Sequence, residues 1–229
     1  MDVVGVSLVA RGAAAATVNA AYCDAASATR LHQAVIASGG RLKRLSVTVR
    51  ATMTTPAALA LGAAVHRAAA GGLEGLALDL GYVDGVAAAA LAGAVAAGDI
   101  ADITLASAAD DAWAVPILLA ATALATLTLR MGVLADETCA AVAAVMAAAP
   151  DLRSVDLSGC AVTPRAAAML AWVAAGRGIA LALDAGAAVA AETEDETDLV
   201  DLVDIFSNDD EKDLDLRCWA APVLAPSFT

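Results

Sequence analysis

One apolar frame recurs along most of the chain and limits its possible folds more than any other feature. The frame reads Leu-x-x-Leu-x-Leu, with Ile or Val at some positions. Its five copies are Leu42, Leu45 and Val47; Leu73, Leu76 and Leu78; Ile100, Ile103 and Leu105; Leu124, Leu127 and Leu129; and Leu152, Val155 and Leu157. The copies start 31, 27, 24 and 28 residues apart, and the alternation inside each one predicts a short strand with one buried face.

A second set of signals follows the predicted strands with the same period. Helix-start residues stand at Thr55-Pro56, Asp84, Asp110, Asp136 and Thr163-Pro164, which are 29, 26, 26 and 27 residues apart. Thr or Asp can accept hydrogen bonds from the free amides of a first helical turn, and Pro fits the first helical position. An alanine-rich run follows each signal, so each unit is predicted to read strand, turn, helix.

The two ends of the repeat are less regular than its middle. Val4, Val6 and Leu8 predict an earlier strand, and residues 27–36 predict its helix, with residues 12–24 as an insertion between them. Ile179, Leu181 and Leu183 predict a last strand that lacks the full frame, which suits a terminal repeat without an outer neighbour.

One unit carries the pattern of a known repeat. Residues 152–163 read Leu-Arg-Ser-Val-Asp-Leu-Ser-Gly-Cys-Ala-Val-Thr. This segment resembles the ribonuclease inhibitor-like, cysteine-containing class of leucine-rich repeat, whose pattern is LxxLxLxxCxL and then a helix; Cys160 and Val162 take its last two positions. The resemblance covers residues 27–184, although the cysteine position holds Arg50, Gly81, Ala108 and Gly132 in the other units. It implies an α/β fold, a right-handed solenoid (horseshoe) of six to seven strand-helix repeats, with a parallel sheet on the concave face and helices outside.

The net charge of −13 is distributed unevenly. Residues 190–229 carry twelve acidic and two basic side chains, a net charge of −10, which leaves −3 for residues 1–189. We expect a repeat domain over 1–189 and an acidic C-terminal cap or tail over 190–229. Apolar residues alternate with aspartates in the tail, so it either covers the open end of the solenoid or binds a partner. This acidity argues against a nucleic-acid partner, because phosphate binding requires clustered Lys and Arg.

A hydrophobic content of 60% raises the question of a membrane span. Residues 112–129 carry no charge and approach the length that crosses a bilayer, but they contain Pro116 and mostly Ala and Thr rather than Leu, Ile and Phe. A secretory signal is not expected either, because Asp2 stands in place of a basic region. The four cysteines are scattered without a CxxC pair, which predicts reduced thiols and an intracellular location, in the cytoplasm or nucleus.

Motifs for catalysis or cofactor binding are not recognisable in the sequence. There is no G-x-S-x-G, P-loop or dinucleotide fingerprint, and His32 and His66 lack the second ligand at the spacing that a zinc site needs. Cys160 falls where the repeat class uses cysteine to fill the core, and buried thiols are inert. Trp113 and Trp172 lie in predicted helices and are interpreted as packing residues. We therefore expect no enzymatic activity, no cofactor and no metal site.

The predicted binding surface is the concave face, because residues between the buried positions of each strand project away from the core. Small polar residues dominate it. They and two arginines make up the set Arg44, Ser46, Thr48, Asp79, Asp102, Thr104, Thr126, Thr128, Arg130, Ser154, Asp156 and Ser158. Tight protein interfaces normally contain Trp, Tyr or Arg anchors, so a solvated face that binds nothing tightly is the alternative.

The leading functional hypothesis is a non-enzymatic protein-protein interaction module or adaptor, since repeat solenoids present a long, rigid surface. The layout of repeats followed by an acidic tail is similar to that of GTPase-activating proteins with this repeat class, so regulation of a small GTPase is an alternative. A ubiquitin-ligase substrate adaptor is a third hypothesis, but residues 1–26 are too short for the F-box domain of such adaptors. The expected partner is another protein, with neither nucleic acid nor a membrane involved.

Overall fold

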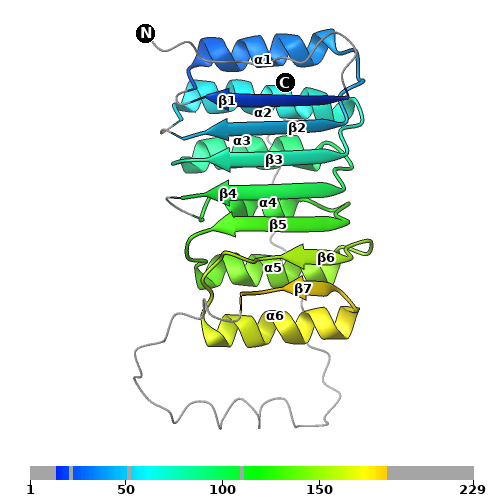
Figure 1. Cartoon of the computed structure of the whole chain (residues 1–229). Coiled ribbons are helices and arrows are strands. Elements are labelled where there is room, and N and C mark those ends of the chain that lie inside the picture. The colour runs from blue at the N-terminus through cyan, green and yellow to red at the C-terminus, as the bar shows by residue number, and fades with distance from the viewer. Residues whose placement is uncertain (1–13, 21–22, 51–52, 109–110, 185–229) are drawn as a thin grey trace, which may run out of the picture. The chain divides into compact units, whose positions relative to one another are not determined.

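Seven strands alternate with six helices in this protein. The computed structural model describes residues 14–20, 23–50, 53–108 and 111–184 of the 229-residue chain, so the predicted acidic cap or tail lies outside the described residues. The strands are parallel and follow one another in chain order within a single sheet (Figure 1). The predicted α/β class with a parallel sheet is therefore confirmed.

Strands and helices alternate strictly along the chain. Their bounds are β1 Ala15–Ala20, α1 Ala25–Ala37, β2 Arg44–Val49, α2 Thr55–Ala70, β3 Gly75–Leu80, α3 Gly85–Ala96, β4 Asp102–Ser107, α4 Ala114–Ala120, β5 Thr126–Met131, α5 Asp136–Ala148, β6 Ser154–Asp156, α6 Pro164–Arg177 and β7 Ala180–Ala182. Five strands therefore fall on the five copies of the repeated frame.

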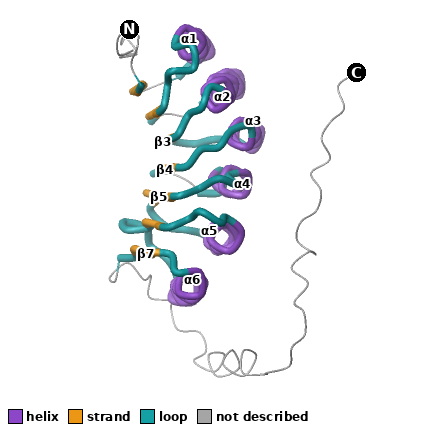
Figure 2. The backbone as a smooth tube through the Cα atoms, turned by 90° about the vertical axis from the view of Figure 1, so that its right-hand side faces the viewer, coloured by secondary structure: helices purple, strands orange, loops and turns teal. Residues whose placement is uncertain are grey.

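All six helices lie in one row on the same side of the sheet, as Figure 2 shows. No helix of the described residues covers the other side, so the outward side chains of the strands form that surface. We call it the strand face. It consists of Arg44, Ser46, Thr48, Ala77, Asp79, Asp102, Thr104, Ala106, Thr126, Thr128, Arg130, Ser154 and Asp156, together with Ser158 just beyond β6.

The repeated apolar residues form ladders between the sheet and the helices. One ladder runs through β2 to β6, where the partners in register are Leu45, Leu76, Ile103, Leu127 and Val155. Each of these side chains is buried. Burial of one such aliphatic side chain contributes about 1.5–3 kcal/mol. A single unit cannot bury its apolar face alone, so neighbouring units stabilise one another.

The first strand does not lie where the sequence predicted it. β1 falls inside residues 12–24, which were expected to be an insertion, and it pairs in parallel with β2. Its residues are mostly small and lack the leucines of the frame, yet Thr17 is exposed and Val18 is buried, as the alternation of a strand requires. The strand expected at Val4, Val6 and Leu8 lies outside the described residues. The helix predicted over residues 27–36 is confirmed as α1.

Three of the predicted helix starts connect or cap the units. Asp84 accepts a hydrogen bond from the Ala87 amide at 2.7 Å, and Thr163 accepts one from the Ala166 amide at 3.2 Å. Thr55 is not the cap that was predicted but the first residue of α2, and its hydroxyl donates to the Asp84 carboxylate at 2.8 Å. This bond links the starts of two consecutive helices.

The other two predicted starts also differ from the structure. α5 begins at Asp136 itself, so this carboxylate stands in the first turn, where the helix dipole favours it. The Ala135 amide just before α5 donates to Asp111 of the preceding unit at 2.6 Å. Asp110 lies outside the described residues, and α4 begins only at Ala114.

The uncharged stretch over residues 112–129 folds as a short helix and a strand. α4 has seven residues, and β5 already begins at Thr126. The copies of the frame that start at Ile100 and Leu124 are only 24 residues apart, so only a short helix fits between their strands. Among the helices that the structure describes, none is long and apolar enough to cross a membrane.

Small side chains set the close spacing between the helices. A Cβ atom on Gly62 of α2 would lie 3.2 Å from the Ala90 carbonyl oxygen of α3. A Cβ atom on Gly98 would lie only 2.6 Å from the Ala69 Cβ. Alanine and glycine therefore let neighbouring helices approach almost to backbone contact.

The helix row has a second open side, which points away from the sheet. We call this the outer helix face, and it consists of exposed residues at helical spacing on α2 to α6. They are Pro56, Leu59, Ala63, His66, Val86, Ala89, Gly93, Ala96, Leu119, Glu137, Ala140, Ala144, Ala147, Arg165, Ala168, Trp172 and Ala175. Only Glu137 and Arg165 among them are charged.

Candidate functional site

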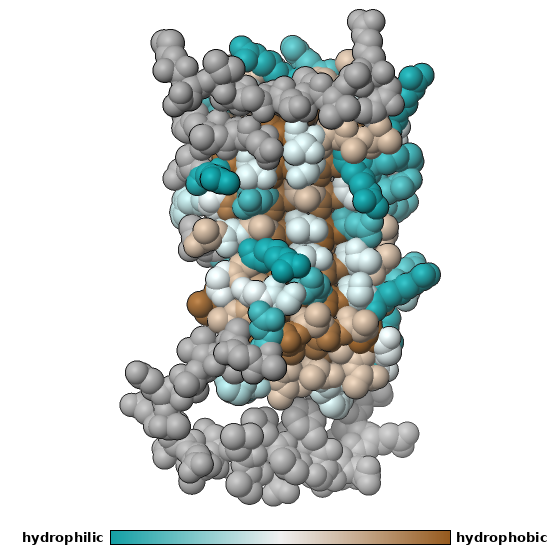
Figure 3. Space-filling model, viewed as in Figure 1, coloured by the Kyte–Doolittle hydropathy of each residue, from teal (hydrophilic) through white to brown (hydrophobic). Residues whose placement is uncertain are grey.

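The strand face is ordered into three rows that cross the strands. The first row is Arg44, Gly75, Asp102, Thr126 and Ser154; the middle row is Ser46, Ala77, Thr104, Thr128 and Asp156; the third row is Thr48, Asp79, Ala106 and Arg130. Figure 3 shows pale columns of weakly polar side chains on this face, with hydrophobic columns visible between them and a few separate hydrophilic groups. Every predicted binding residue lies on this face, half-buried or exposed.

An ion pair and a hydrogen bond connect the first row across four strands. The Arg44 guanidinium lies 3.8 Å from the Asp102 carboxylate, although Gly75 of β3 stands between them. A Cβ atom on Gly75 would lie 3.3 Å from the Arg44 Cγ, so the missing side chain leaves room for the arginine to cross β3. Asp102 also accepts a hydrogen bond from the Thr126 hydroxyl at 2.6 Å.

A second cluster holds the end of the strand face near β5 and β6. The Arg130 guanidinium lies 2.9 Å from the Asp156 carboxylate and donates to the Ser158 carbonyl oxygen at 3.2 Å. Asp156 also accepts hydrogen bonds from the Ser158 hydroxyl and, at 2.9 Å, from the Ser158 amide. The Ser158 hydroxyl, followed by its amide, lowers the pKa of Asp156 below the ordinary value. The ionised carboxylate therefore keeps the arginine in one position.

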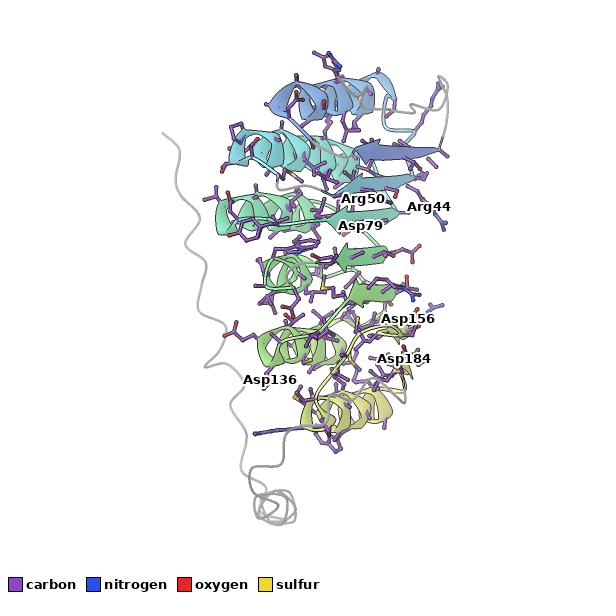
Figure 4. All side chains as sticks on the ribbon, turned by 60° about the vertical axis from the view of Figure 1, so that its left-hand side comes forward. Arg44, Arg50, Asp79, Asp136, Asp156 and Asp184 are labelled. Atoms are coloured by element: carbon purple, nitrogen blue, oxygen red, sulfur yellow. The ribbon has the colours of Figure 1, made fainter. Side chains whose placement is uncertain are left out.

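Two charged side chains of this region have no such partner. Among the described residues, neither Asp79 on β3 nor Arg50 just after β2 forms a hydrogen bond or ion pair, and both are exposed. Figure 4 shows Arg50 just past the end of β2, beside β3 with Asp79, and Arg44 at the opposite end of β2. Arg50 occupies the position in the repeated frame that Cys160 holds in its own unit. The middle row carries only small side chains until Asp156 ends it.

Asp184, just after the last strand, was not predicted from the sequence as a site residue. Its carboxylate accepts a hydrogen bond from the Gly159 amide at 2.7 Å, and Gly159 adopts a positive φ of 87°. Figure 4 shows Asp184 and Asp156 on the strand side of the last two units, whereas Asp136 lies on the helix side. A signal was present, because an acidic residue directly follows the last predicted strand and a Ser-Gly turn precedes Cys160.

The described cysteines are buried and serve packing. Cys160 accepts a hydrogen bond from the Met131 amide and donates to the Leu129 carbonyl oxygen, both at 3.3 Å. Burial raises the pKa of the Cys160 thiol, and burial together with Asp136 raises the pKa of Cys139 to about 11. Because only a thiolate is a good nucleophile, neither side chain is suited to covalent catalysis. The predicted position of Cys160 in the core is confirmed.

Outside the strand face, the described residues bring few catalytic or metal-binding side chains together. His32 lies on α1 and His66 on α2, and no group of three or more His, Cys, Asp and Glu in the described ranges is placed to hold a metal ion. A cavity of about 140 Å³ lies where α1 and α2 end, and Ser38, Arg67 and Gly71 are among its lining residues. Its walls are mainly glycine and alanine, so it brings no cluster of reactive side chains together.

The two tryptophans of the described residues have opposite environments. Trp113 is 2% exposed, which confirms that it is a packing residue. The same prediction is wrong for Trp172, which is 73% exposed on α6. α6 is the last helix of the row, so no later helix among the described residues packs against it.

Comparisons with protein-family models, curated proteins and solved structures found no match to this chain.

Proposed function

We propose that this chain is a leucine-rich repeat solenoid of the ribonuclease inhibitor-like class and a non-enzymatic protein-protein interaction module. The observation that carries the proposal is the strand face. It is open over the whole described sheet, and its outward side chains are aligned in three rows. A protein partner binds across these rows.

The order and placement of the elements support the repeat class. A doubly wound α/β sheet has helices on both faces and a strand order that reverses at a switch point. Here the strands follow chain order, and the helices stand on one side (Figure 2). The Cys160 thiol bonds to the backbone of the neighbouring β5, which is the packing role that the repeat pattern gives this position. These features favour a solenoid that grows by one unit at a time.

The chemistry of the strand face suggests how a partner is recognised. Arg44 and Arg130 are held by carboxylates, so binding to them costs little side-chain entropy. Asp79 on β3 and Arg50 just after β2 provide an anion and a cation that pair with no other side chain among the described residues. The small middle row leaves space for larger side chains of the partner. We expect an extended segment that lies across the strands and carries a basic group near Asp79 and an acidic group near Arg50.

The cysteines support an intracellular setting, in the cytoplasm or nucleus. Cys23, Cys139 and Cys160 are free and buried in the described residues. A chain that keeps several unpaired thiols is typical of a reducing compartment.

Quantitative affinity capture tests the proposal with the full chain as bait. The double variant Thr104→Lys and Thr128→Lys places two long cations on the middle row, where both native side chains are half-buried. Thr29→Lys and Gln33→Lys add the same charge on exposed positions of α1 and form the matched control. The proposal predicts partners that wild type and control retain and that the strand-face variant loses. Equal capture by all three proteins would exclude the strand face as the binding surface.

A further inference from the structure

The outer helix face lacks the polar side chains that a solvent-exposed helix row normally carries. A surface helix usually has charged or polar residues opposite its buried stripe. α3 and α4 have no charged residue at all, and their exposed outward residues are small or apolar, including Val86 at 59% and Leu119 at 58% exposure. α2 and α6 add Leu59 at 49% and Trp172 at 73%. Helices with this composition are expected to be covered.

The charges near this face stand at its edge. Glu137 and Arg165 lie in the first turns of α5 and α6, and Asp136 begins α5. Arg67 and Arg177 lie in the last turns of α2 and α6. Protein interfaces have this arrangement, with an uncharged centre and a polar rim. Because the rim carries both signs, it can complement itself.

The size of the face fits an interface between two copies. At about 1.5 Å per residue, helices α2 to α6 are about 10–24 Å long, and at spacings of about 9 Å they span about 700–800 Å². This is close to the roughly 800 Å² that each partner buries in a standard complex. Monomeric proteins rarely expose apolar patches of more than a few hundred Å².

Neighbouring helices of this chain pack closely through glycine and alanine. Within the helix row, Gly62 of α2 meets Ala90 of α3 so closely that an added Cβ would lie 3.2 Å from the Ala90 carbonyl oxygen. The best complement of an alanine and glycine surface is therefore another surface of the same kind, and a second copy supplies one. A partner with a charged surface would have to desolvate its charges against alanine without pairing them.

We propose that two copies of this chain pack through their outer helix faces in a symmetric homodimer, which leaves both strand faces open to a partner. A two-fold arrangement uses the same patch on both copies, as closed dimers do. The dimer is independent of the proposed function, since it uses the opposite side of each molecule.

Sedimentation velocity of the full chain over a wide concentration series tests this dimer. Ala89→Glu with Ala144→Glu places two carboxylates on exposed positions of α3 and α5, and Glu is a good helix former. Ala180→Glu with Ala182→Glu makes the same change on exposed positions of β7 and is the matched control. We expect wild type and control to dimerise, and the outer-face variant to raise the dissociation constant about 100-fold or more.

Further arms of the experiment keep the proposal open to refutation. Far-ultraviolet circular dichroism of each variant checks folding. If the double Glu variant does not fold, the neutral substitutions Val86→Gln and Leu119→Gln must weaken the dimer instead. A wild-type chain that stays monomeric at every concentration overturns the proposal, as does equal weakening by both double Glu variants. Flotation of a monomeric wild type with neutral lipid vesicles would assign the face to a lipid surface and would also overturn it.

Discussion

The strand face and the outer helix face are both open in the described structure, but their chemistry is opposite. On the strand face, Arg44, Asp102 and Thr126 form a connected polar row, and Arg130 and Asp156 form another cluster. The outer helix face carries mainly alanine with a few large apolar side chains. Period-two alternation places polar residues on one face of a strand, whereas α2 to α6 carry few polar residues on their outward side. This difference is the basis on which we propose two binding modes, one for each face.

The largest expected effect is the difference in stability loss between a buried and an outward residue on the same strand, β5. Leu129 is fully buried, and Leu129→Ala should lower the free energy of unfolding by about 2–5 kcal/mol. Its neighbour Thr128 points outward, and Thr128→Ala should cost less than about 1 kcal/mol. Urea unfolding of both variants measures the contrast. Similar losses would mean that the strand face is not a surface.

The next effect compares alanine substitutions at two glycines on the helix side, Gly98, which is tightly packed, and Gly93, which has free space at its Cβ position. An added Cβ at Gly98 would lie 2.6 Å from Ala69, so Gly98→Ala should cost about 1–3 kcal/mol. Gly93 of α3 has no atom within 4 Å of the Cβ position, so Gly93→Ala should stabilise the helix by about 0.5–1 kcal/mol. Thermal melts of the two variants should shift in opposite directions. A loss of stability in both would contradict the open outer helix face.

A smaller effect concerns the polar cluster of the strand face. Arg130→Ala removes an ion pair and a hydrogen bond that are partly exposed, so it should cost about 0.2–1 kcal/mol. Added salt should reduce this difference, because salt screens exposed charges. Ala144→Ser on the outer helix face provides the comparison, since it neither adds nor removes a charge and its cost should not depend on salt. Denaturation at low and high ionic strength checks both.

The smallest effect is the acid sensitivity that a single carboxylate adds, at a helix start (Asp84) and on the strand face (Asp156). Hydrogen bonds from the Ala87 amide and then the Thr55 hydroxyl lower the pKa of Asp84, and those from Ser158 lower the pKa of Asp156. A carboxyl whose pKa is lower in the folded state stabilises above its unfolded pKa, and this stabilisation is lost as the pH falls through the folded pKa.

Two Asn variants measure this acid sensitivity. Asp84→Asn keeps a capping side chain but removes the charge, so it should lose less stability than wild type when the pH falls below the ordinary value of 3.8. Asp156→Asn should behave in the same way. Denaturant unfolding at neutral and acid pH measures how the free energy of unfolding changes with pH. A change equal to that of wild type in both variants would refute the prediction.

The repeated frame allowed prediction of β2 to β6 and of their outward residues, because alternation fixes which side chains are buried. β1 escaped prediction because small residues such as Thr17 carry no leucine signal. The pair of Arg44 and Asp102 depends on the register of three strands and on the absence of a side chain at Gly75, which no single strand reveals.

The outer helix face was also missed from the sequence. Alanine fits both a buried and an exposed helix position, so the composition alone does not separate the two. The exposure of Trp172 depends on which helix comes last in the row. Only the arrangement of the helices in space distinguishes these surfaces.

Site-specific photo-crosslinking tests the central claim most directly, because the same full chain can report on each face in turn. A photoreactive residue replaces Thr104 on the strand face in one protein and Ala89 on the outer helix face in another. We predict that position 104 crosslinks to a different protein and position 89 to a second copy of this chain. The same protein captured from both positions, or no protein captured at position 104, would contradict the account.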